Sequence, residues 1–148
     1  MNILSFQTPL GWITICEENK QVSFIKFGRN KNKGKSKVLI NLKKQIIEFI
    51  TGDRKKFSVK LNIQGTTLQK KIWSQLITIN YGSIKTYGDI AKKLKTSPRY
   101  VGSVCGQNNH LLVIPCHRVI RSDGSLGGFS GLGGIKLKHK LLNLEKND

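Results

Sequence analysis

Residues 114–120 of the chain read IPCHRVI and place a thiol beside an imidazole among aliphatic side chains. The two reactive residues are Cys116 and His117. A cysteine is nucleophilic as the thiolate, and nearby cations and hydrogen-bond donors favour that form. If the stretch is an extended strand, the two side chains point to opposite faces, so that a water would have to link them. A third group would then orient the imidazole, and Glu145 in the last predicted helix is the best acidic candidate.

Less reactive interpretations of the same residues stay open at this level. A free cysteine is usually a small buried hydrophobic residue, and the residues around Cys116 alone do not favour chemistry over that role. A cysteine hydrolase would need turnover and an acyl substrate. A metal-binding module is possible in composition, although the spacings fit no zinc pattern. Its ligands would be Cys105, His110, Cys116 and His117.

The first half of the chain predicts a small lobe with a sheet and one helix. Apolar and polar residues alternate from Ile3 to Phe27, with breaks at TPLG and EENK, which indicates a three-stranded antiparallel meander. A polar loop follows at residues 29–37, and a helix then runs as far as Gly52. The apolar residues at helical spacing in it are Leu39, Leu42, Ile46, Ile47 and Ile50.

The second half predicts helices. Residues 66–79 repeat apolar side chains at helical spacing. Thr86 and Asp89 can cap a second helix, and Ser97 followed by Pro98 opens a third. Only the residues KTS separate the two, which indicates a helix-turn-helix, although any pair of adjacent helices gives this pattern.

A glycine-rich loop and a last helix complete the predicted fold. The loop is SDGSLGGFSGLGG at residues 122–134. Its glycines fit a flexible linker, and its apolar residues fit a structured loop near a ligand at least as well. The helix IKLKHKLLNLEK follows it. We therefore predict an α+β fold with an N-terminal α/β lobe over residues 1–63, which has an antiparallel sheet and a helix. The second domain, residues 64–148, would be mostly helical, with the helix-turn-helix and the loop that carries Cys116.

The charge of the chain indicates a polyanionic partner. Lys and Arg number 26 against 8 Asp and Glu, a net charge of +18, and each side of Ile63 has 13 basic and 4 acidic residues. For residues 20–60 we favour a lysine-rich solvated surface as the explanation. No apolar run approaches the roughly 20 residues of a membrane span, and the N-terminus lacks a secretory signal. Three scattered cysteines argue against a disulfide framework, so we expect a cytoplasmic protein without a membrane partner.

Four motifs together resemble the O6-alkylguanine-DNA alkyltransferases, also called methylated-DNA-protein-cysteine methyltransferases. IPCHRVI is similar to the active-site signature of that family, and SPRYVG to its recognition helix. GTTLQKKIWSQLITINYGSIKTYGDIAKKL resembles the segment that leads into its helix-turn-helix, and GFSG its binding loop. The resemblance covers residues 65–145 in register, whereas the first 63 residues match only in size and order of elements.

The resemblance implies repair of double-stranded DNA by direct reversal. The alkyl group of O6-alkylguanine, and less readily of O4-alkylthymine, would pass irreversibly to Cys116, once per molecule. No cofactor or metal is expected, and the protein would act as a monomer. Residues 64–148 would then be the DNA-binding and alkyl-acceptor domain. The alternative is a non-catalytic alkyltransferase-like protein that only binds DNA lesions, but such proteins carry Trp at the position of Cys116.

Roles for single residues follow from the same resemblance. Cys116 would be the acceptor, His117 and Glu145 the relay that deprotonates it, and Tyr87 the donor to guanine N3. The implied nucleic-acid-binding residues are Arg99, Tyr100, Gly102, Ser103, Asn108 and Arg118. Among them, Arg99 would enter the base stack, and Asn108 would brace the turn between the recognition helix and the active-site segment. The implied base pocket contains Val119, Phe129 and Ser130, of which Val119 would contribute its backbone.

Several positions depart from the family pattern. Asn109 stands where a proline commonly follows the hinge asparagine, and Phe129 replaces the usual tyrosine of the binding loop. The segment LGGI is longer than the usual spacing before the last helix, which affects the expected register of Glu145. Cys16 has no histidine near it in the sequence, so the zinc site of some relatives is not expected.

Overall fold

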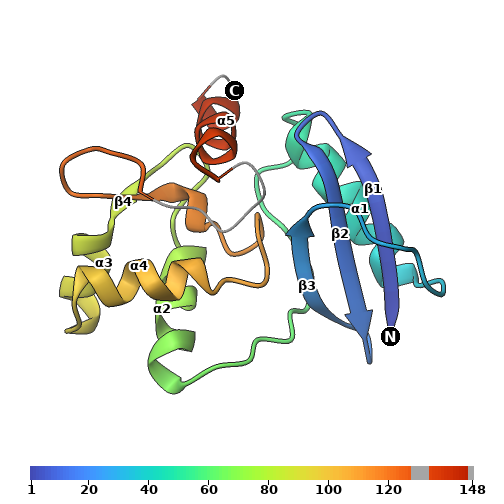
Figure 1. The fold of residues 1–148 in the computed structure, drawn as a ribbon, viewed down its shortest axis with the longest axis horizontal. Helices are drawn as coiled ribbons and strands as arrows, with labels where there is room; N and C mark the ends of the chain where they lie inside the picture. The colour runs from blue at the N-terminus through green and yellow to red at the C-terminus, as the bar shows by residue number, and fades with distance from the viewer. Residues whose placement is uncertain (128–133, 147–148) are drawn as a thin grey trace. The chain divides into compact units, whose positions relative to one another are not determined.

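A computed structural model of the chain describes residues 1–127 and 134–146. The described residues form two compact units, of which the first contains residues 1–63 and 109–111 and the second contains residues 64–108, 112–127 and 134–146. Figure 1 colours both by residue number. The predicted α+β class, with a sheet and helix before a mostly helical region, is confirmed. Within the described residues, no helix is long and apolar enough to cross a membrane.

The sheet of the first unit is the predicted antiparallel meander. Its strands are β1 (Asn2–Thr8), β2 (Gly11–Glu18) and β3 (Gln21–Phe27), in the order β1-β2-β3. Asn19 and Lys20 form the second turn with φ angles of 53° and 65°, the left-handed values that a two-residue hairpin turn of type I′ requires. The turn therefore joins β2 directly to β3.

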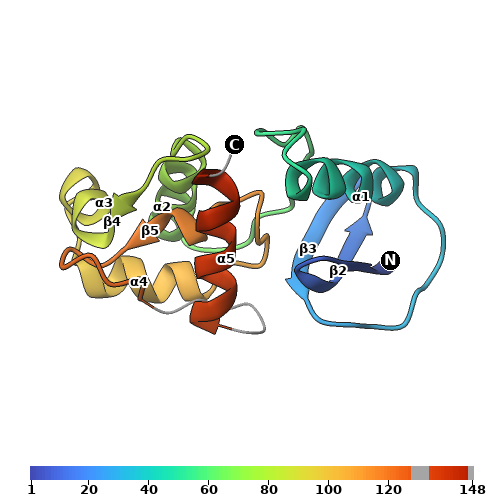
Figure 2. The ribbon, with the colours of Figure 1, turned by 90° about the horizontal axis from the view of Figure 1, so that it is seen from above.

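One helix, α1 (Lys37–Ile50), packs against all three strands, and Figure 2 shows it lying along the sheet. Ser36 caps it by accepting a hydrogen bond from the Leu39 amide at 3.3 Å. Ile47, which the spacing placed in the apolar set, is 40% exposed, and Phe49 is buried instead. The buried side chains of α1 are Leu39, Leu42, Gln45, Ile46, Phe49 and Ile50.

A short later segment completes the first unit beside β3. The Ile25 amide donates to the Asn109 carbonyl at 2.8 Å, and the Leu111 amide donates to the Ile25 carbonyl at 3.2 Å. The ring of His110 is buried and its Nε2 lies 2.9 Å from the Val22 carbonyl oxygen. These bonds explain why residues 109–111 belong to the first unit although the chain around them belongs to the second.

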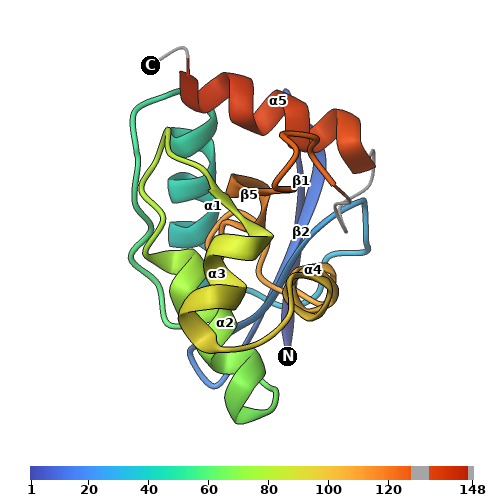
Figure 3. The ribbon, with the colours of Figure 1, turned by 90° about the vertical axis from the view of Figure 1, so that its left-hand side faces the viewer.

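Helices dominate the second unit, with one short parallel strand pair. Its elements are α2 (Thr67–Ile77), β4 (Lys85–Thr86), α3 (Tyr87–Leu94), α4 (Pro98–Gly106), β5 (Val119–Ile120) and α5 (Gly134–Lys146). Thr86 and Asp89 form the predicted capping box of α3, and Ser97 caps α4 with Pro98 in its first turn. Lys95 ends α3 in a left-handed conformation (φ 57°), which turns the chain into α4. Figure 3 shows α3 and α4 side by side, so the predicted helix-turn-helix is confirmed.

Candidate active site

A tight turn, and not an extended strand, presents Cys116. Pro115 has φ −81° and ψ 65°, and the Cys116 amide donates to the Ile114 carbonyl at 2.8 Å, which is an inverse γ-turn. The Arg118 amide donates to the Pro115 carbonyl at 3.0 Å, so that Cys116–Arg118 is one turn of 3-10 helix. The expectation that residues 114–120 are extended is therefore wrong before Val119, because proline fixes its φ angle and closes the chain into a turn.

The sulfur of Cys116 lies beside a buried amide. The Cys116 residue is only 3% exposed, and Asn108 Nδ2 donates to its Sγ at 3.3 Å and to the Ile114 carbonyl at 2.8 Å. Burial raises the pKa of the thiol to about 11, although the hydrogen bond from Asn108 and the charge of Lys138 act in the opposite direction. The thiol is thus protonated at neutral pH, and a base is needed to make it nucleophilic.

His117 and Arg118 both point to the carboxylate of Glu145 on α5. His117 Nε2 lies 2.6 Å from Glu145 Oε2, and Arg118 Nε and Nη2 donate to the same carboxylate, each at 2.9 Å to its nearer oxygen. The Gly82 amide donates to Oε1 at 3.0 Å. The longer glycine-rich segment therefore does not prevent Glu145 from reaching His117.

This cluster fixes the protonation of the imidazole. Burial alone would raise the pKa of Glu145, but hydrogen bonds and charge from His117 and Arg118 lower it to about 2. Burial lowers the pKa of His117, more than the hydrogen bond to Glu145 raises it. An ionised carboxylate can only accept a hydrogen bond, so Nε2 carries the proton of the neutral ring and Nδ1 is its basic nitrogen.

The side chain of Arg118, predicted to bind nucleic acid, is directed to internal partners in the structure. The residue is 6% exposed, its guanidinium is paired with Glu145, and its Nη1 donates to the Ile79 carbonyl at 2.8 Å. A side chain with these internal partners cannot reach a phosphate group. Its physical role is to hold the carboxylate that orients His117, which local sequence spacing could not reveal because Glu145 is 27 residues away.

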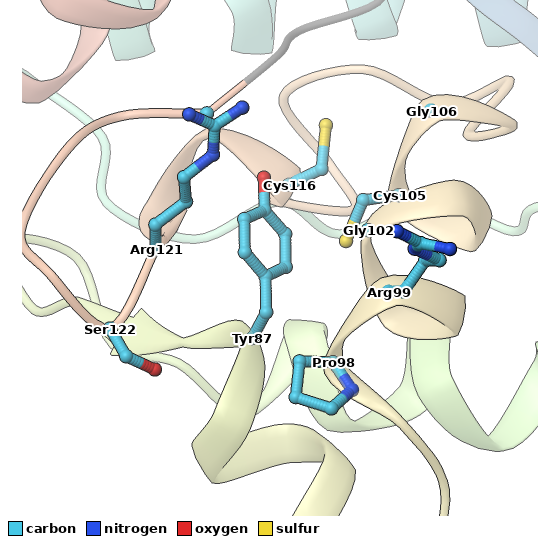
Figure 4. A pocket seen from close by; sticks show the side chains of 10 residues that line it. Tyr87, Pro98, Arg99, Gly102, Cys105, Gly106, Cys116, Arg121 and Ser122 are labelled. Carbon is cyan, nitrogen blue, oxygen red and sulfur yellow. The ribbon is translucent and has the colours of Figure 1, made fainter.

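Cys116 opens onto a cavity of about 730 Å³ in the second unit. Figure 4 shows Tyr87 standing in it, with Arg121 on one side and residues of α4 on the other. The lining residues are Tyr87, Pro98, Arg99, Gly102, Cys105, Gly106, Cys116, Arg121, Ser122 and Gly127. A cavity of this size can take a nucleobase, and glycines on two walls let a flat ring approach the backbone.

The hydroxyl of Tyr87 is held by a buried lysine on α5. Lys138 is fully buried, and its Nζ donates to Tyr87 Oη at 3.3 Å and to the Leu126 carbonyl. Burial raises the pKa of Tyr87 to about 12, so the phenol keeps its proton at neutral pH. Gly127 (φ 72°) lies so close that a Cβ there would be 3.0 Å from this hydroxyl. Tyr87 is thus fixed in the cavity as a hydrogen-bond donor.

Several residues of this site were not predicted: besides Lys138 and Cys105, the cavity wall contains Pro98, Gly106, Arg121, Ser122 and Gly127. Lys138 shares the buried face of α5 with Leu137, Leu141 and Glu145, and this helical spacing was a signal that the sequence contained. Cys105, near the end of α4, lines the cavity, and burial raises the pKa of its thiol to about 12. Its position in the sequence gave no sign of this, because contact with the cavity depends on how α4 packs.

The other predicted residues divide into exposed and buried sets. On α4, Arg99 and Ser103 are exposed, whereas Tyr100 and Gly102 are half-buried. Asn108 is 5% exposed and donates to Cys116, which is the kind of bracing contact predicted for it, and its place among the nucleic-acid-binding residues stays a prediction. The Val119 side chain is fully buried, and its backbone is in β5. Phe129 and Ser130, with most of the GFSG motif, lie outside the described residues.

Over residues 1–127 and 134–146, no group of three or more His, Cys, Asp or Glu side chains could hold a metal ion. His110 Nε2 is bonded to Val22 and His117 Nε2 to Glu145, so the rings of the alternative metal module are directed to other partners. All three cysteines are free thiols.

The fold and site correspond to a DNA-binding module of known type. Residues 67–147 match the model of the 6-O-methylguanine DNA methyltransferase, DNA binding domain. The crystal structure of Mycobacterium tuberculosis OGT in complex with DNA is similar, with a TM-score of 0.88 and 30% identity over 98% of this chain and 92% of that one. A Methanococcus jannaschii O6-methylguanine DNA methyltransferase has a TM-score of 0.71 and 26% identity, covering 98% and 94% of the two chains.

Relatives that align over nearly the whole chain are named as methyltransferases of the same kind as the matched domain. The methylated-DNA-protein-cysteine methyltransferase of Sulfolobus acidocaldarius is 34% identical over 142 residues, which is 95% of this chain and 90% of the relative. The enzyme of the same name from Methanosarcina acetivorans is 32% identical over 154 aligned positions, 95% of each chain. This chain belongs to the methylated-DNA-protein-cysteine methyltransferase family, as its four motifs predicted.

Proposed function

We propose that this protein repairs DNA by direct reversal, transferring the alkyl group of O6-alkylguanine, and less readily of O4-alkylthymine, to the sulfur of Cys116. One observation carries the proposal: Cys116 lines a base-sized cavity and lies next to a buried His117–Glu145 pair. Membership of the family supports the reaction type. The buried position of Cys116 therefore serves chemistry and not only packing.

The first step is removal of the proton from Cys116. Because burial raises the pKa of the thiol to about 11, the base must act within the site. His117 donates through Nε2 to Glu145, so that Nδ1 would accept the thiol proton through a bridging water. The Glu145 carboxylate stabilises the imidazolium that forms, and Asn108 donates to the new thiolate.

The second step is displacement at the alkyl carbon. The thiolate attacks that carbon, an S–C bond forms, the C–O6 bond breaks, and the electron pair passes to the guanine ring. Tyr87 would donate to guanine N3 and so limit the charge on the departing base. Its position in the cavity and its pKa of about 12 support this role, because a phenol that keeps its proton is a donor. The product is a thioether that no side chain of the site can hydrolyse, so each molecule acts once.

The DNA would be bound by the helix-turn-helix as an intact duplex with one extruded nucleotide. Arg99 is exposed on α4 and lines the cavity, so it can fill the gap that the extruded base leaves in the stack. Gly102 and Ser103 lie on the same helix and would permit close approach to the groove. We also propose that the protein acts as a monomer. Its location would be the cytoplasm, because three free thiols suit a reducing compartment.

A stoichiometric assay tests this function. The protein is incubated with an excess of duplex carrying one O6-methylguanine, and restored guanine is counted per protein molecule. We expect a plateau at about one guanine per chain, and none with Cys116→Ser, in keeping with a nucleophile that is consumed. Continuous turnover would refute the single-use reaction. Tight binding without any restored guanine would instead indicate the lesion-binding alternative.

A further inference from the structure

Over the residues that the structure describes, the lining of the cavity carries positive charge and no negative charge. Arg99 and Arg121 are exposed and line it, and none of its ten lining residues is Asp or Glu. A neutral base would need no cation at this place. Two guanidiniums without a carboxylate fit a ligand that brings its own negative charge, as a nucleotide does through its phosphate groups.

Arg121 differs from the two buried cations close to the site in how its side chain is used. Arg118 is bound to Glu145 and Lys138 to Tyr87 and Leu126, and both residues are buried. The side chain of Arg121 makes no hydrogen bond or ion pair with any other residue that the structure describes. The carboxylate of Asp123, two residues further on, accepts hydrogen bonds from the amide and hydroxyl of Ser125. The guanidinium is therefore available for a ligand.

The backbone holds Arg121 in place. Its amide donates to the Ser125 carbonyl at 2.9 Å, and the Gly124 amide donates back to the Arg121 carbonyl at 3.0 Å. Gly124 has a φ of 90°, which this closed turn requires. The hydroxyl of Ser122, also in the cavity wall, lies near the start of α3, since a Cβ on Gly88 would be 3.1 Å from it. A rigid turn thus presents a guanidinium and a hydroxyl together.

We propose that Arg121 and Ser122 form a subsite for the phosphodiester group of the extruded nucleotide, on the wall of the cavity opposite Arg99. Figure 4 shows Arg121 and Arg99 on the two sides of Tyr87. The planar guanidinium can donate two parallel hydrogen bonds to phosphate oxygens, and the serine hydroxyl can donate a third. Arg99 would act inside the duplex, whereas Arg121 would act on the nucleotide itself. The subsite rests on the proposed function, because it binds the substrate of Cys116.

The test compares three substrates that differ in whether they have a phosphate backbone and a stacked duplex. They are a duplex with O6-methylguanine, the same sequence as a single strand, and the free base O6-benzylguanine, which has no phosphate. For Arg121→Ala, the ratio of the rate with either DNA to the rate with the free base should fall about tenfold or more, as expected for a lost charge-assisted bond. The slope of log binding constant against log salt concentration should also decrease by the contribution of about one phosphate contact. Arg121→Lys should restore the salt dependence and part of the rate.

Two further variants serve as controls. Arg99→Ala should reduce the rate with duplex much more than with single strand, because only the duplex has a stack to fill. Lys136→Ala removes one exposed charge from α5 outside the cavity and should leave all the ratios near those of the unaltered protein. The subsite is refuted if Arg121→Ala slows the free base as much as DNA, or if it leaves the three rates in their original ratio. Failure of the unaltered protein to react with any of the three substrates would refute the proposed function instead.

Discussion

Cys105 and Cys116 line the same cavity from two regions of the second unit, the last part of α4 and the turn after Pro115. Both are buried, and burial raises the pKa of both thiols, to about 12 for Cys105 and to about 11 for Cys116. Sulfur chemistry, burial and access to the cavity therefore do not distinguish them.

The surroundings of the two sulfurs do distinguish them. The Sγ of Cys116 accepts a hydrogen bond from Asn108. Cys116 is followed by His117, whose ring is hydrogen-bonded to Glu145. Among the residues that the structure describes, none donates a hydrogen bond to the sulfur of Cys105, and Cys105 is followed in the chain by Gly106 and not by a histidine. A buried thiol becomes a nucleophile only when a base and a donor for the thiolate are built beside it.

Substitution of Cys116 and substitution of Cys105 should have opposite effects on alkyl transfer. Cys116→Ser should reduce alkyl transfer from O6-methylguanine duplex by more than about a thousandfold, because a hydroxyl is a far weaker nucleophile. Cys105→Ala should still restore about one guanine per chain. Quenched-flow assays with radiolabelled methyl groups would measure both. Methyl transfer that persists in Cys116→Ser and disappears in Cys105→Ala would reverse the assignment.

The base can be tested through the pH dependence of the reaction with a free alkylated base. With His117 neutral, the rate of the unaltered protein should be nearly flat from about pH 7 to pH 9. His117→Gln keeps a donor to Glu145 but loses the base, so its rate should follow the thiolate population and rise about tenfold per pH unit below the thiol pKa of about 11. At pH 7 we expect a loss of about a hundredfold or more. His139→Gln, on the exposed side of α5, is the control. Parallel profiles for His117→Gln and the unaltered protein would rule out His117 as the base.

Loss of the buried carboxylate should cost stability. Glu145→Gln leaves Arg118 without its charge partner, and breaking a buried pair costs about 3–5 kcal/mol in the free energy of unfolding, which urea titration would measure. Glu48→Gln is the matched control, because the Glu48–Arg54 pair is about a third exposed (32% and 31%) and should cost less than about 1 kcal/mol. Equal losses in the two variants would contradict the special position of Glu145.

The same cluster predicts how stability depends on pH. The folded pKa of Glu145, about 2, is below its ordinary value of 4.5, so its stabilisation is present above about pH 4.5 and is lost as pH falls through about 2. The folded pKa of His117 is also lowered, so stability begins to fall when pH drops below its ordinary 6.5. Glu145→Gln should lack the acidic part of this slope. A free energy of unfolding that rises on acidification would contradict both shifts.

The smallest effect is expected in the first unit. Lys31, Lys33 and Lys35 are exposed and far in sequence from the cavity residues. Replacement of all three by Gln should change the rate with free O6-benzylguanine by less than about twofold and the free energy of unfolding by less than about 0.5 kcal/mol per residue. A larger loss with the free base would mean that this unit contributes to the chemistry and not only to charge.

Local patterns in the sequence predicted most of the fold. The capping residues Thr86 and Ser97 marked the starts of α3 and α4, and the alternation over residues 3–27 gave the sheet. Such signals act over a few residues, so the sequence contains them directly. The turn at Pro115 was missed because an apolar run resembles a strand until the proline closes it.

The sequence predicted the residues of the site better than it predicted the contacts between them. Cys116, His117 and Glu145 were singled out by the chemistry of their side chains and Tyr87 by the resemblance, and the structure brings the first three into one neighbourhood. Arg118 was assigned to DNA binding because the sequence gives its charge but does not give its partner on α5, Glu145. Contacts of this kind depend on packing between distant segments, which spacing along the chain does not encode.

The most direct test of the account locates the transferred group. The protein is incubated with duplex that carries O6-methylguanine, digested, and the three cysteine peptides are compared by mass spectrometry. The account predicts a gain of one methylene on the peptide with Cys116 in nearly every molecule, and none on the peptides with Cys16 or Cys105. A methyl group on Cys105, or an unmodified Cys116 in intact protein whose DNA has been repaired, would contradict it.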